Sequence, residues 1–307
     1  MNQNKILEVN NLKQYFEINK YLTIKAVDGI SFHVNEGEIY GLVGESGCGK
    51  STVAKSLMGL YDITEGEVFY KGNKISDRKV YRSLKNDLQK NMQIIFQDSS
   101  AALNPRMTVE KIISEPLRIN RIIDDKEVLS KRVSELMKQV GLSENIKCQY
   151  PSEISGGQRQ RVAIARSISL NPKIIIADEP IASLDISIQA QIINLFQMLQ
   201  KEYGFTFIFI AHDLSIVRFL CDRVSVMLKG RIVESAETNE IFEHPLHPYT
   251  KSLLSAIPVP DPKVNKARKF IGYDTNELTD GGTLKEMCEG HYVYINNGLN
   301  GCTNGQT

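Results

Sequence analysis

The feature that most constrains this chain is a glycine-rich turn between an apolar run and a helix-like stretch. Residues 44–51 read GESGCGKS and match the pattern G-x-x-x-x-G-K-[ST] in full. An apolar run over residues 39–43 precedes the turn, and apolar side chains recur at helical spacing over residues 53–58. The pattern therefore predicts a strand, a tight loop and a helix in direct succession.

The residue types in this turn are suited to binding the phosphates of a nucleotide. Glycines let successive backbone N–H groups point into one concavity, and the positive end of the following helix dipole faces the same point. Lys50 brings a cation to the β- and γ-phosphates, and Ser51 offers a hydroxyl ligand to Mg²⁺. We therefore expect nucleotide binding, the alternative being a strand-to-helix turn that binds nothing.

Composition narrows the class of protein further. The 307 residues allow one large domain, or one domain with an appendage, and 37 Lys and Arg balance 36 Asp and Glu. This balance argues against a nucleic-acid binder held by bulk charge. Neither an 18-residue apolar run nor the apolar core of a secretory signal is present, and the five cysteines form no C-x-x-C pair. We expect a protein of a reducing, cytosolic compartment without disulfides.

Polar side chains close three predicted buried strands, which are residues 92–96, 173–178 and 205–211. Gln97 follows the first strand, Asp178 and Glu179 end the second, and His212 follows the third. Because the carboxyl ends of parallel strands meet at one edge of a sheet, we expect a single site beside the phosphate loop. Asp178 suits Mg²⁺, and Glu179 is suited to orienting or deprotonating the attacking water. Taken singly, each residue would be an ordinary strand terminus.

Other segments allow a coarse outline of the chain. We expect strands over residues 6–9 and 24–35, and hairpins around residues 66–73 and 224–233. Residues 98–165 change character, with helical patterns near 108–117 and 126–140, and we expect an inserted helical subdomain. It ends in ISGGQRQR at residues 154–161, where small residues at a helix start indicate either a second anion site or a simple helix cap.

Two further motifs leave alternatives open. Tyr15 and Phe16 lie upstream of the phosphate loop, where an aromatic ring can stack on adenine or simply pack in the core. The two His-Pro pairs in HPLHPYTKSLLSAIP, residues 244–258, favour a rigid turn over a metal site.

Cys48 lies inside the loop, near a helix start and Lys50, and we expect this setting to favour the reactive thiolate. A buried, inert thiol is the alternative.

The order of the motifs carries a family resemblance. GESGCGKST, Gln97, ISGGQRQR, IIIADEP, the SLD of residues 183–185 and His212 together resemble the ATP-binding subunit of an ABC transporter, over about residues 5–258. The phrases ALNPRMTV, LDISIQAQIINL and HPLHPYTKSLLSAIP resemble the oligopeptide/dipeptide importer branch, which includes nickel importers.

The resemblance implies an α/β fold: a P-loop NTPase (RecA-like) core with an antiparallel β-subdomain and an inserted helical subdomain. It implies an ABC nucleotide-binding domain over residues 1–258, and leaves residues 259–307 as a C-terminal extension ending in a mobile tail at 295–307.

The resemblance also assigns roles, with ATP and Mg²⁺ as cofactors. Phe16 (or Tyr15) stacks on adenine. The phosphates are held by Gly44, Glu45, Ser46, Gly47, Cys48, Gly49, Lys50, Ser51 and Thr52. The metal set is Ser51, Gln97 and Asp178, and Gln97 also senses the attacking water and links to the membrane partner. The catalytic set is Glu179, the base, and His212, which contacts the γ-phosphate.

A second set acts across a dimer of ATPase subunits. Ser155, Gly157 and Gln158 close on ATP held by the opposite subunit, and Asp185 bridges the dimer. The partners implied are a second ATPase subunit (usually an unlike chain, otherwise a second copy), two integral membrane permease subunits and, indirectly, an extracytoplasmic solute-binding protein. The subunit would be peripheral, at the cytoplasmic face of the cell membrane. Nucleic acid is not expected, although a soluble ABC-type ATPase acting on nucleic acid or ribosomes is the second hypothesis.

The sequence departs from the family pattern in places. Ile154 stands where leucine is common, and Ile181-Ala182-Ser183 varies the usual loop before Leu184-Asp185. Many relatives carry a C-terminal cysteine cluster that binds an iron–sulfur centre, whereas here two cysteines, Cys288 and Cys302, lie beyond residue 250. We therefore expect no such cluster, and little family resemblance in the last 45 or so residues.

Overall fold

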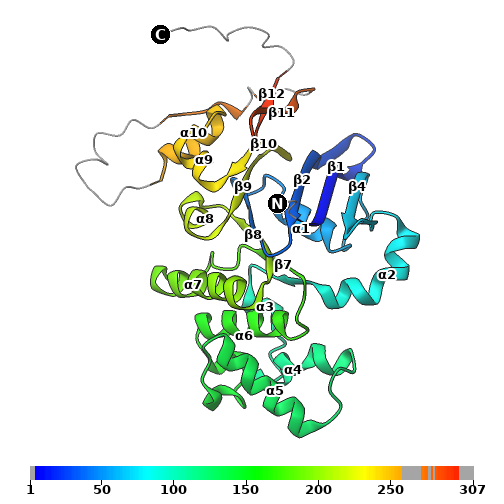
Figure 1. Cartoon of the computed structure of the whole chain (residues 1–307), viewed down its shortest axis with the longest axis vertical. Coiled ribbons are helices and arrows are strands. Elements are labelled where there is room, and N and C mark those ends of the chain that lie inside the picture. Colours follow the sequence, from blue (N-terminus) through cyan, green and yellow to red (C-terminus); the bar gives the residue numbers. More distant parts are fainter. Residues whose placement is uncertain (1–3, 258–270, 276–277, 279–280, 297–307) are drawn as a thin grey trace, which may run out of the picture.

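A parallel sheet forms the centre of the molecule (Figure 1). The computed structural model describes residues 4–257, 271–275, 278 and 281–296. The larger sheet has the strand order β11-β12-β10-β9-β3-β8-β7-β6, in which the last five strands run parallel. These strands are β9 (Arg223–Leu228), β3 (Ile39–Val43), β8 (Thr206–Ala211), β7 (Ile174–Asp178) and β6 (Met92–Ile95).

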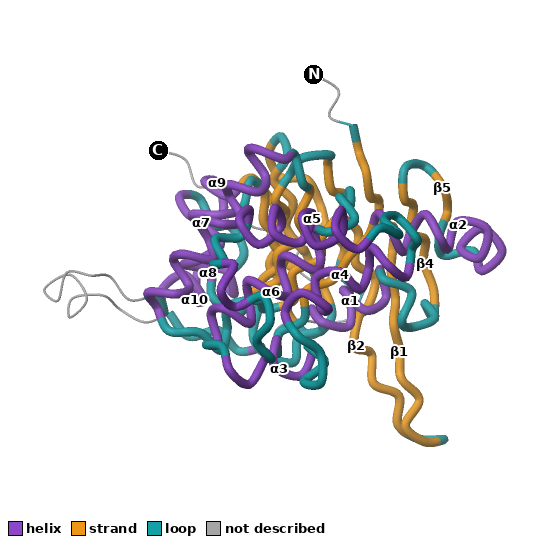
Figure 2. The backbone as a smooth tube through the Cα atoms, turned by 90° about the horizontal axis from the view of Figure 1, so that it is seen from below, coloured by secondary structure: helices purple, strands orange, loops and turns teal. Residues whose placement is uncertain are grey.

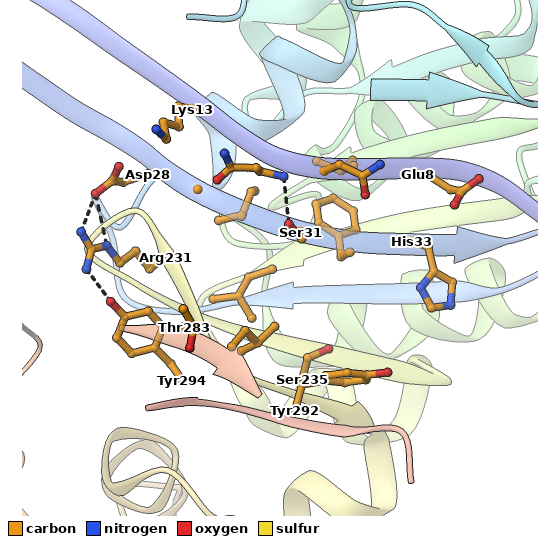
Figure 3. Close-up of a pocket in the computed structure, with 18 of the residues that line it drawn as sticks. Glu8, Lys13, Asp28, Ser31, His33, Arg231, Ser235, Thr283, Tyr292 and Tyr294 are labelled. Carbon is orange, nitrogen blue, oxygen red and sulfur yellow. Dashed lines mark hydrogen bonds and ion pairs between the residues drawn. The ribbon is translucent and has the colours of Figure 1, made fainter. Parts of the chain in front are cut away.

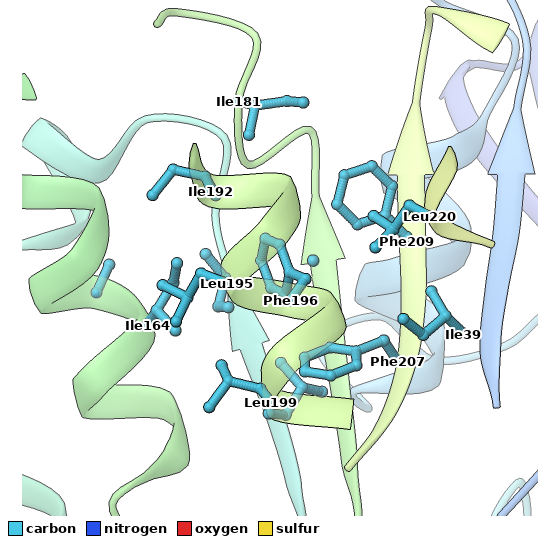
Figure 4. Close-up of a cluster of buried hydrophobic side chains, with 14 of the residues drawn as sticks. Ile39, Ile164, Ile181, Ile192, Leu195, Phe196, Leu199, Phe207, Phe209 and Leu220 are labelled. Atoms are coloured by element: carbon cyan, nitrogen blue, oxygen red, sulfur yellow. The ribbon is translucent and has the colours of Figure 1, made fainter. Parts of the chain in front are cut away.

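The continuous apolar runs of the central strands follow from burial on both faces of the sheet. All five residues of β7 are buried, and alternate side chains enter two different hydrophobic clusters. Ile175 packs toward α7 (Ile186–Tyr203), whose Phe196 ring meets the rings of Phe207 and Phe209 edge-on at 5.2 and 5.6 Å (Figure 4). Ile176 packs on the opposite face with α1 (Lys50–Leu57). The strands predicted at residues 92–96, 173–178 and 205–211 are confirmed.

A smaller antiparallel sheet covers α1. Its strand order is β2-β1-β4-β5, with β1 (Lys5–Asn19), β2 (Leu22–Asn35), β4 (Glu65–Tyr70) and β5 (Asn73–Lys74). The predicted strands at 6–9 and 24–35 and the hairpin at 66–73 are confirmed, although β1 and β2 are longer than expected. Their hairpin extends well beyond the body of the molecule (Figure 2).

The chain between β6 and β7 lies outside the sheet and is mostly helical. The helices here are α3 (Ser99–Ala102), α4 (Val109–Ile119), α5 (Lys126–Gln139) and α6 (Gly156–Ile168), with short 3₁₀ turns at Glu144–Ile146 and Pro151–Glu153. α4, α5 and α6 pack on one another at the end of the molecule opposite the C-terminal strands (Figure 1). The helices predicted near 108–117 and 126–140 are confirmed. Sequence patterns had not indicated α2 (Arg78–Asn91).

The C-terminal segment extends the larger sheet. It comprises α8 (Leu214–Leu220) before β9, then β10 (Arg231–Glu237), α9 (Thr238–Glu243), α10 (Pro248–Ser255), β11 (Thr283–Cys288) and β12 (His291–Ile295). The β9–β10 hairpin was predicted, whereas β11 and β12 were not. β12 pairs antiparallel with β10, with Glu234 opposite Val293.

Arg231 ties this edge to the smaller sheet. Its Nη2 donates to Asp28 Oδ2 at 2.6 Å and its Nη1 donates to the Tyr294 hydroxyl at 2.6 Å (Figure 3). The predicted mobile tail lies outside the described residues from 297 onward. Within the described ranges, no helix is both long and apolar enough to cross a membrane.

Candidate nucleotide site

The phosphate loop joins β3 directly to α1, and two of its glycines are required by close backbone neighbours. A Cβ on Gly44 would lie 2.1 Å from the Met227 carbonyl oxygen, and one on Gly49 would lie 2.1 Å from that of Ala26. Gly49 also has φ 109°, a conformation that side chains other than glycine rarely adopt. The loop is therefore clamped between β9 and β2, and its N–H groups are fixed at the start of α1.

Lys50 is buried at the first position of α1, and its ammonium is held inside the loop. Nζ donates to the carbonyl oxygens of Gly44 at 2.7 Å and Glu45 at 2.9 Å. It also lies 3.9 Å from Glu179 Oε1. The loop thus places a desolvated cation beside the end of β7, where a transferred phosphate would need one.

Ser51 and Asp178 form a direct pair. Ser51 Oγ donates to Asp178 Oδ1 at 2.9 Å, joining the first turn of α1 to the end of β7. Burial raises the pKa of the Asp178 carboxyl, and the neighbouring charge of Glu179 adds to this effect, while the Ser51 hydrogen bond and the lysines oppose it. A buried carboxylate of this kind is stabilised by a cation at its open side.

The side chains of Gln97, His212 and Lys50 converge on the Glu179 carboxylate. Its Oε2 accepts a hydrogen bond from Gln97 Nε2 at 3.2 Å and lies 3.2 Å from His212 Nδ1. Its backbone has φ 46°, a strained conformation for a residue with a side chain, and its side chain is 11% exposed. The structure thus brings together Gln97, Glu179 and His212, as the common sheet edge predicts, with Lys50 on the other oxygen of Glu179.

Lys50, Gln97 and Glu179 line an open cleft of about 580 Å³, whereas Asp178 and His212 do not line it. Of the other expected loop residues, Ser46, Gly47, Gly49, Ser51 and Thr52 line the cleft, and Gly44, Glu45 and Cys48 do not. Its walls also include groups that the sequence did not indicate: Ile24, Lys25 and Ala26 of β2, and Lys229 and Gly230 of the β9–β10 turn. Their only sequence signal was the Lys-Gly turn. Phe16 is not part of the wall, but it pairs with Ile24 across β1 and β2, and its ring meets Tyr61 edge-on at 5.2 Å. The Tyr15 hydroxyl is instead bonded to Asp28.

A second polar group forms elsewhere in the chain. Ser155 caps α6: its Oγ accepts from Gln158 N at 3.3 Å, while its own N–H donates to Gln158 Oε1 at 2.8 Å. A Cβ on Gly157 would lie 2.8 Å from Ile188, so the start of α6 is packed against the start of α7, which Asp185 precedes. Ser155 and Asp185 are exposed, and neither lines the cleft of the phosphate loop.

The expectation of a reactive Cys48 is wrong. The Cys48 side chain is 5% exposed, and burial raises the pKa of its thiol, although Lys50 Nζ lies only 3.7 Å from Sγ and opposes the rise. The nearby cation and the helix start, which lower the pKa of a thiol, can be read from the sequence. The desolvation of the Cys48 thiol depends on packing from other segments, and its effect on the pKa outweighs both.

The second of the two His-Pro pairs begins a helix, and the rigid-turn interpretation of the first stays a prediction. His247 is the N-cap of α10, and its Nδ1 accepts a hydrogen bond from Tyr249 N at 3.1 Å. Pro248 occupies the first helical turn, where the missing N–H costs nothing. The imidazole is buried and engaged in capping.

Comparison with known proteins identifies the family. Residues 27–182 match the family model described as ABC transporter, and residues 233–289 match the one described as oligopeptide/dipeptide transporter, C-terminal region. The oligopeptide transport ATP-binding protein OppF of Bacillus subtilis is 50% identical over 293 residues, covering 94% of this chain and 95% of the relative. The chain belongs to the ABC transporter ATPases. OppF of Streptococcus mutans is 47% identical, with 95% of each chain covered.

Solved structures agree with the ABC ATPase fold. The dimeric ATP-binding cassette MJ0796, in a post-hydrolysis state with ADP and phosphate, superposes with a TM-score of 0.67 at 30% identity, covering 76% of this chain and 98% of that one. CbiO1 of Clostridium perfringens, part of a transporter complex, gives a TM-score of 0.70 at 28% identity, with 86% and 99% covered. The P-loop NTPase fold expected from the sequence is confirmed.

One expectation about family coverage is wrong. The C-terminal region of this ABC ATPase carries its own family match over residues 233–289, whose described part includes most of β10, then α9, α10 and β11; β12 follows directly after it. Sequence reasoning looked for a cysteine cluster there and overlooked the alternating strand pattern of residues 283–295.

We expect Glu179→Gln to bind ATP with nearly unchanged affinity and to hydrolyse it at least about 10²-fold more slowly, because the expected base is removed while the loop contacts remain. Nucleotide binding and phosphate release measured on the same preparation separate the two effects. Glu243→Gln, an exposed carboxylate on α9, is the matched control and should hydrolyse ATP normally. Turnover of Glu179→Gln at the wild-type rate would disprove the assignment.

We expect Cys48 to resist maleimide in the folded protein at pH 7, because a buried thiol with a raised pKa presents little thiolate. Cys148 and Cys288 are exposed and serve as internal controls that should be labelled. Peptide mass spectrometry after brief labelling, with and without denaturant, measures the difference. Equal labelling of Cys48 and Cys148 in the folded state would contradict the burial argument.

Proposed function

We propose that this ABC ATPase powers an importer of oligopeptides. The observation that carries the proposal is the match along nearly the whole chain to oligopeptide transport ATP-binding proteins, together with the match of residues 233–289 to the model described as oligopeptide/dipeptide transporter, C-terminal region. The convergent site around the phosphate loop supplies the chemistry such a subunit needs.

The proposed hydrolysis uses the groups at the end of β7. Glu179 takes the proton of the attacking water, and Gln97 and His212, both in contact with its Oε2, orient the carboxylate and the water. Lys50 stabilises the negative charge that develops on the phosphate oxygens. Phe16 is proposed to contact the adenine, since its cross-strand partner Ile24 lines the cleft.

Mg²⁺ fits the residues present. Hydroxyl, carboxylate and amide oxygens are the ligands that this hard cation prefers. Burial raises the pKa of the Asp178 carboxyl, and a bound cation would stabilise its charged form. Ser51, Asp178 and Gln97 would hold the ion. Bound there, Mg²⁺ would neutralise charge on the nucleotide phosphates.

We propose that two ATPase subunits complete each site together. Ser155 and Asp185 are exposed, Gly157 and Gln158 are half-buried, and none of the four lines the chain's own cleft. The dimeric cassettes among the solved neighbours support this arrangement. The partner subunit is proposed to be an unlike ATPase or a second copy. The pair would act on two permease subunits at the cytoplasmic face of the membrane, served by an extracytoplasmic solute-binding protein.

We expect Ser155→Asp to keep the fold and the binding of ATP to the isolated subunit, because aspartate also caps a helix. The added charge would face the phosphates held by the opposite subunit, and ATP hydrolysis by the assembled transporter should fall at least about tenfold. Ser152→Asp, exposed three residues earlier, is the control and should retain activity. Full hydrolysis by Ser155→Asp would argue against a site shared between subunits.

The substrate is tested by growth of a strain that lacks this chain and cannot make one amino acid. We expect the strain to use the free amino acid but not oligopeptides that contain it, because import would lack its energy source. The wild-type gene should restore growth, and the Glu179→Gln gene should not. Normal growth on peptides combined with loss of nickel uptake would instead favour a nickel importer.

A further inference from the structure

The C-terminal region touches the phosphate loop through one buried side chain. Tyr249, in the first turn of α10, is 2% exposed, and its hydroxyl oxygen accepts a hydrogen bond from the backbone N–H of Glu45 at 3.4 Å. Glu45 is the second residue of the loop, and its carbonyl is one of the two that hold Lys50. The contact therefore lies directly behind the groups that receive the phosphates.

The position of Tyr249 is fixed by a series of buried contacts. Glu234 of β10 is completely buried and accepts the backbone N–H groups of Leu246 at 2.7 Å and His247 at 3.0 Å, which anchors the chain entering α10. His247 in turn caps the N–H of Tyr249. The rings of His247 and Tyr249 each lie 5.7 Å from the ring of Tyr273.

The same carboxylate also receives the C-terminal hairpin. His291, the first residue of β12, is 3% exposed, and its Nε2 lies 2.8 Å from Glu234 Oε1. Glu234 thus joins β10, the start of α10 and β12 in one buried polar cluster. Fully partnered buried groups of this kind hold their neighbours rigidly.

We infer that Tyr249 is a positioning residue for nucleotide binding, through which the C-terminal region holds the phosphate loop in its binding conformation. Glu45, whose N–H makes this hydrogen bond, has an exposed side chain. The Tyr249 hydroxyl satisfies the first N–H beyond Gly44, at the point where the chain turns away from β3. Without this hydrogen bond, the loop would have to become ordered when nucleotide binds, and the entropy lost would weaken the observed binding free energy.

The charge state of the hydroxyl suits this role. Burial raises the pKa of Tyr249, so the group stays neutral throughout the physiological range and does not repel the phosphates. A neutral acceptor stabilises the loop while leaving the charge of Lys50 for the nucleotide.

The test is Tyr249→Phe in the full-length chain, which removes one oxygen atom and keeps the ring packing. We expect the Kd for a fluorescent ATP analogue, and the KM for ATP, to rise roughly three- to tenfold, the size expected for one neutral hydrogen bond. The kcat at saturating ATP should stay within about twofold, because the contact is present before and during the reaction. The melting temperature should change little.

Tyr70→Phe is the matched control, because it also removes a buried tyrosine hydroxyl, one that has no hydrogen-bond partner among the described residues. It should leave Kd and KM unchanged. Tyr249→Leu should raise KM at least as much as Tyr249→Phe and also lower the melting temperature. Unchanged Kd and KM in Tyr249→Phe, or a fall in kcat at constant KM, would overturn the proposal.

Discussion

Two adjacent carboxylates, Asp178 and Glu179, lie at the end of one buried strand, and the other polar groups of the site compensate their charge. Asp178 and Glu179 both leave water when β7 is sandwiched between two apolar layers, and like charges so placed destabilise one another. Ser51 donates to the first, while Gln97 donates to the second, with Lys50 beside it. The phosphate loop must therefore lie beside β7 for electrostatic reasons as well as catalytic ones, since it supplies both the hydroxyl and the ammonium.

Two groups of polar residues lie apart on the chain, one at the cleft of the phosphate loop and one at the start of α6. The cleft gathers the groups proposed to bind phosphate and activate water, whereas the start of α6 presents Ser155 and two glycines, with the Arg159 guanidinium bonded to the Ile154 carbonyl just before it. A helix start of this kind attracts anions, and its N–H groups need a partner once water is excluded. If two subunits share each site as proposed, this separation makes a complete site depend on assembly, and hydrolysis is then sensitive to the arrangement of the subunits.

Local patterns allowed much of this to be predicted. The phosphate loop is specified within eight residues, and the central strands are continuous apolar runs because both their faces are buried. The features that were predicted wrongly or missed depend on contacts with segments that are distant in the sequence. The thiol of Cys48 is desolvated by packing that its own segment does not reveal, and β12 owes its place to pairing with β10, more than fifty residues earlier. The cleft walls at Ile24 of β2 and Lys229 of the β9–β10 turn likewise come from segments that the two sheets bring beside the loop.

Clamping of the phosphate loop from three distant segments has a consequence for the family-specific C-terminal region. Met227 of β9 and Ala26 of β2 press on two of its glycines from fixed backbone, whereas Tyr249 meets it through a side chain on a short helix. The first two contacts come from strands that are hydrogen-bonded within the two sheets. The third rests on α10, whose entry is held by the cluster around Glu234 that also receives β12. α10 is held by these polar contacts and by the burial of Tyr249 and Leu254 in the main hydrophobic cluster, so in the proposed role of Tyr249 the C-terminal region adds a fixed third contact to the phosphate loop.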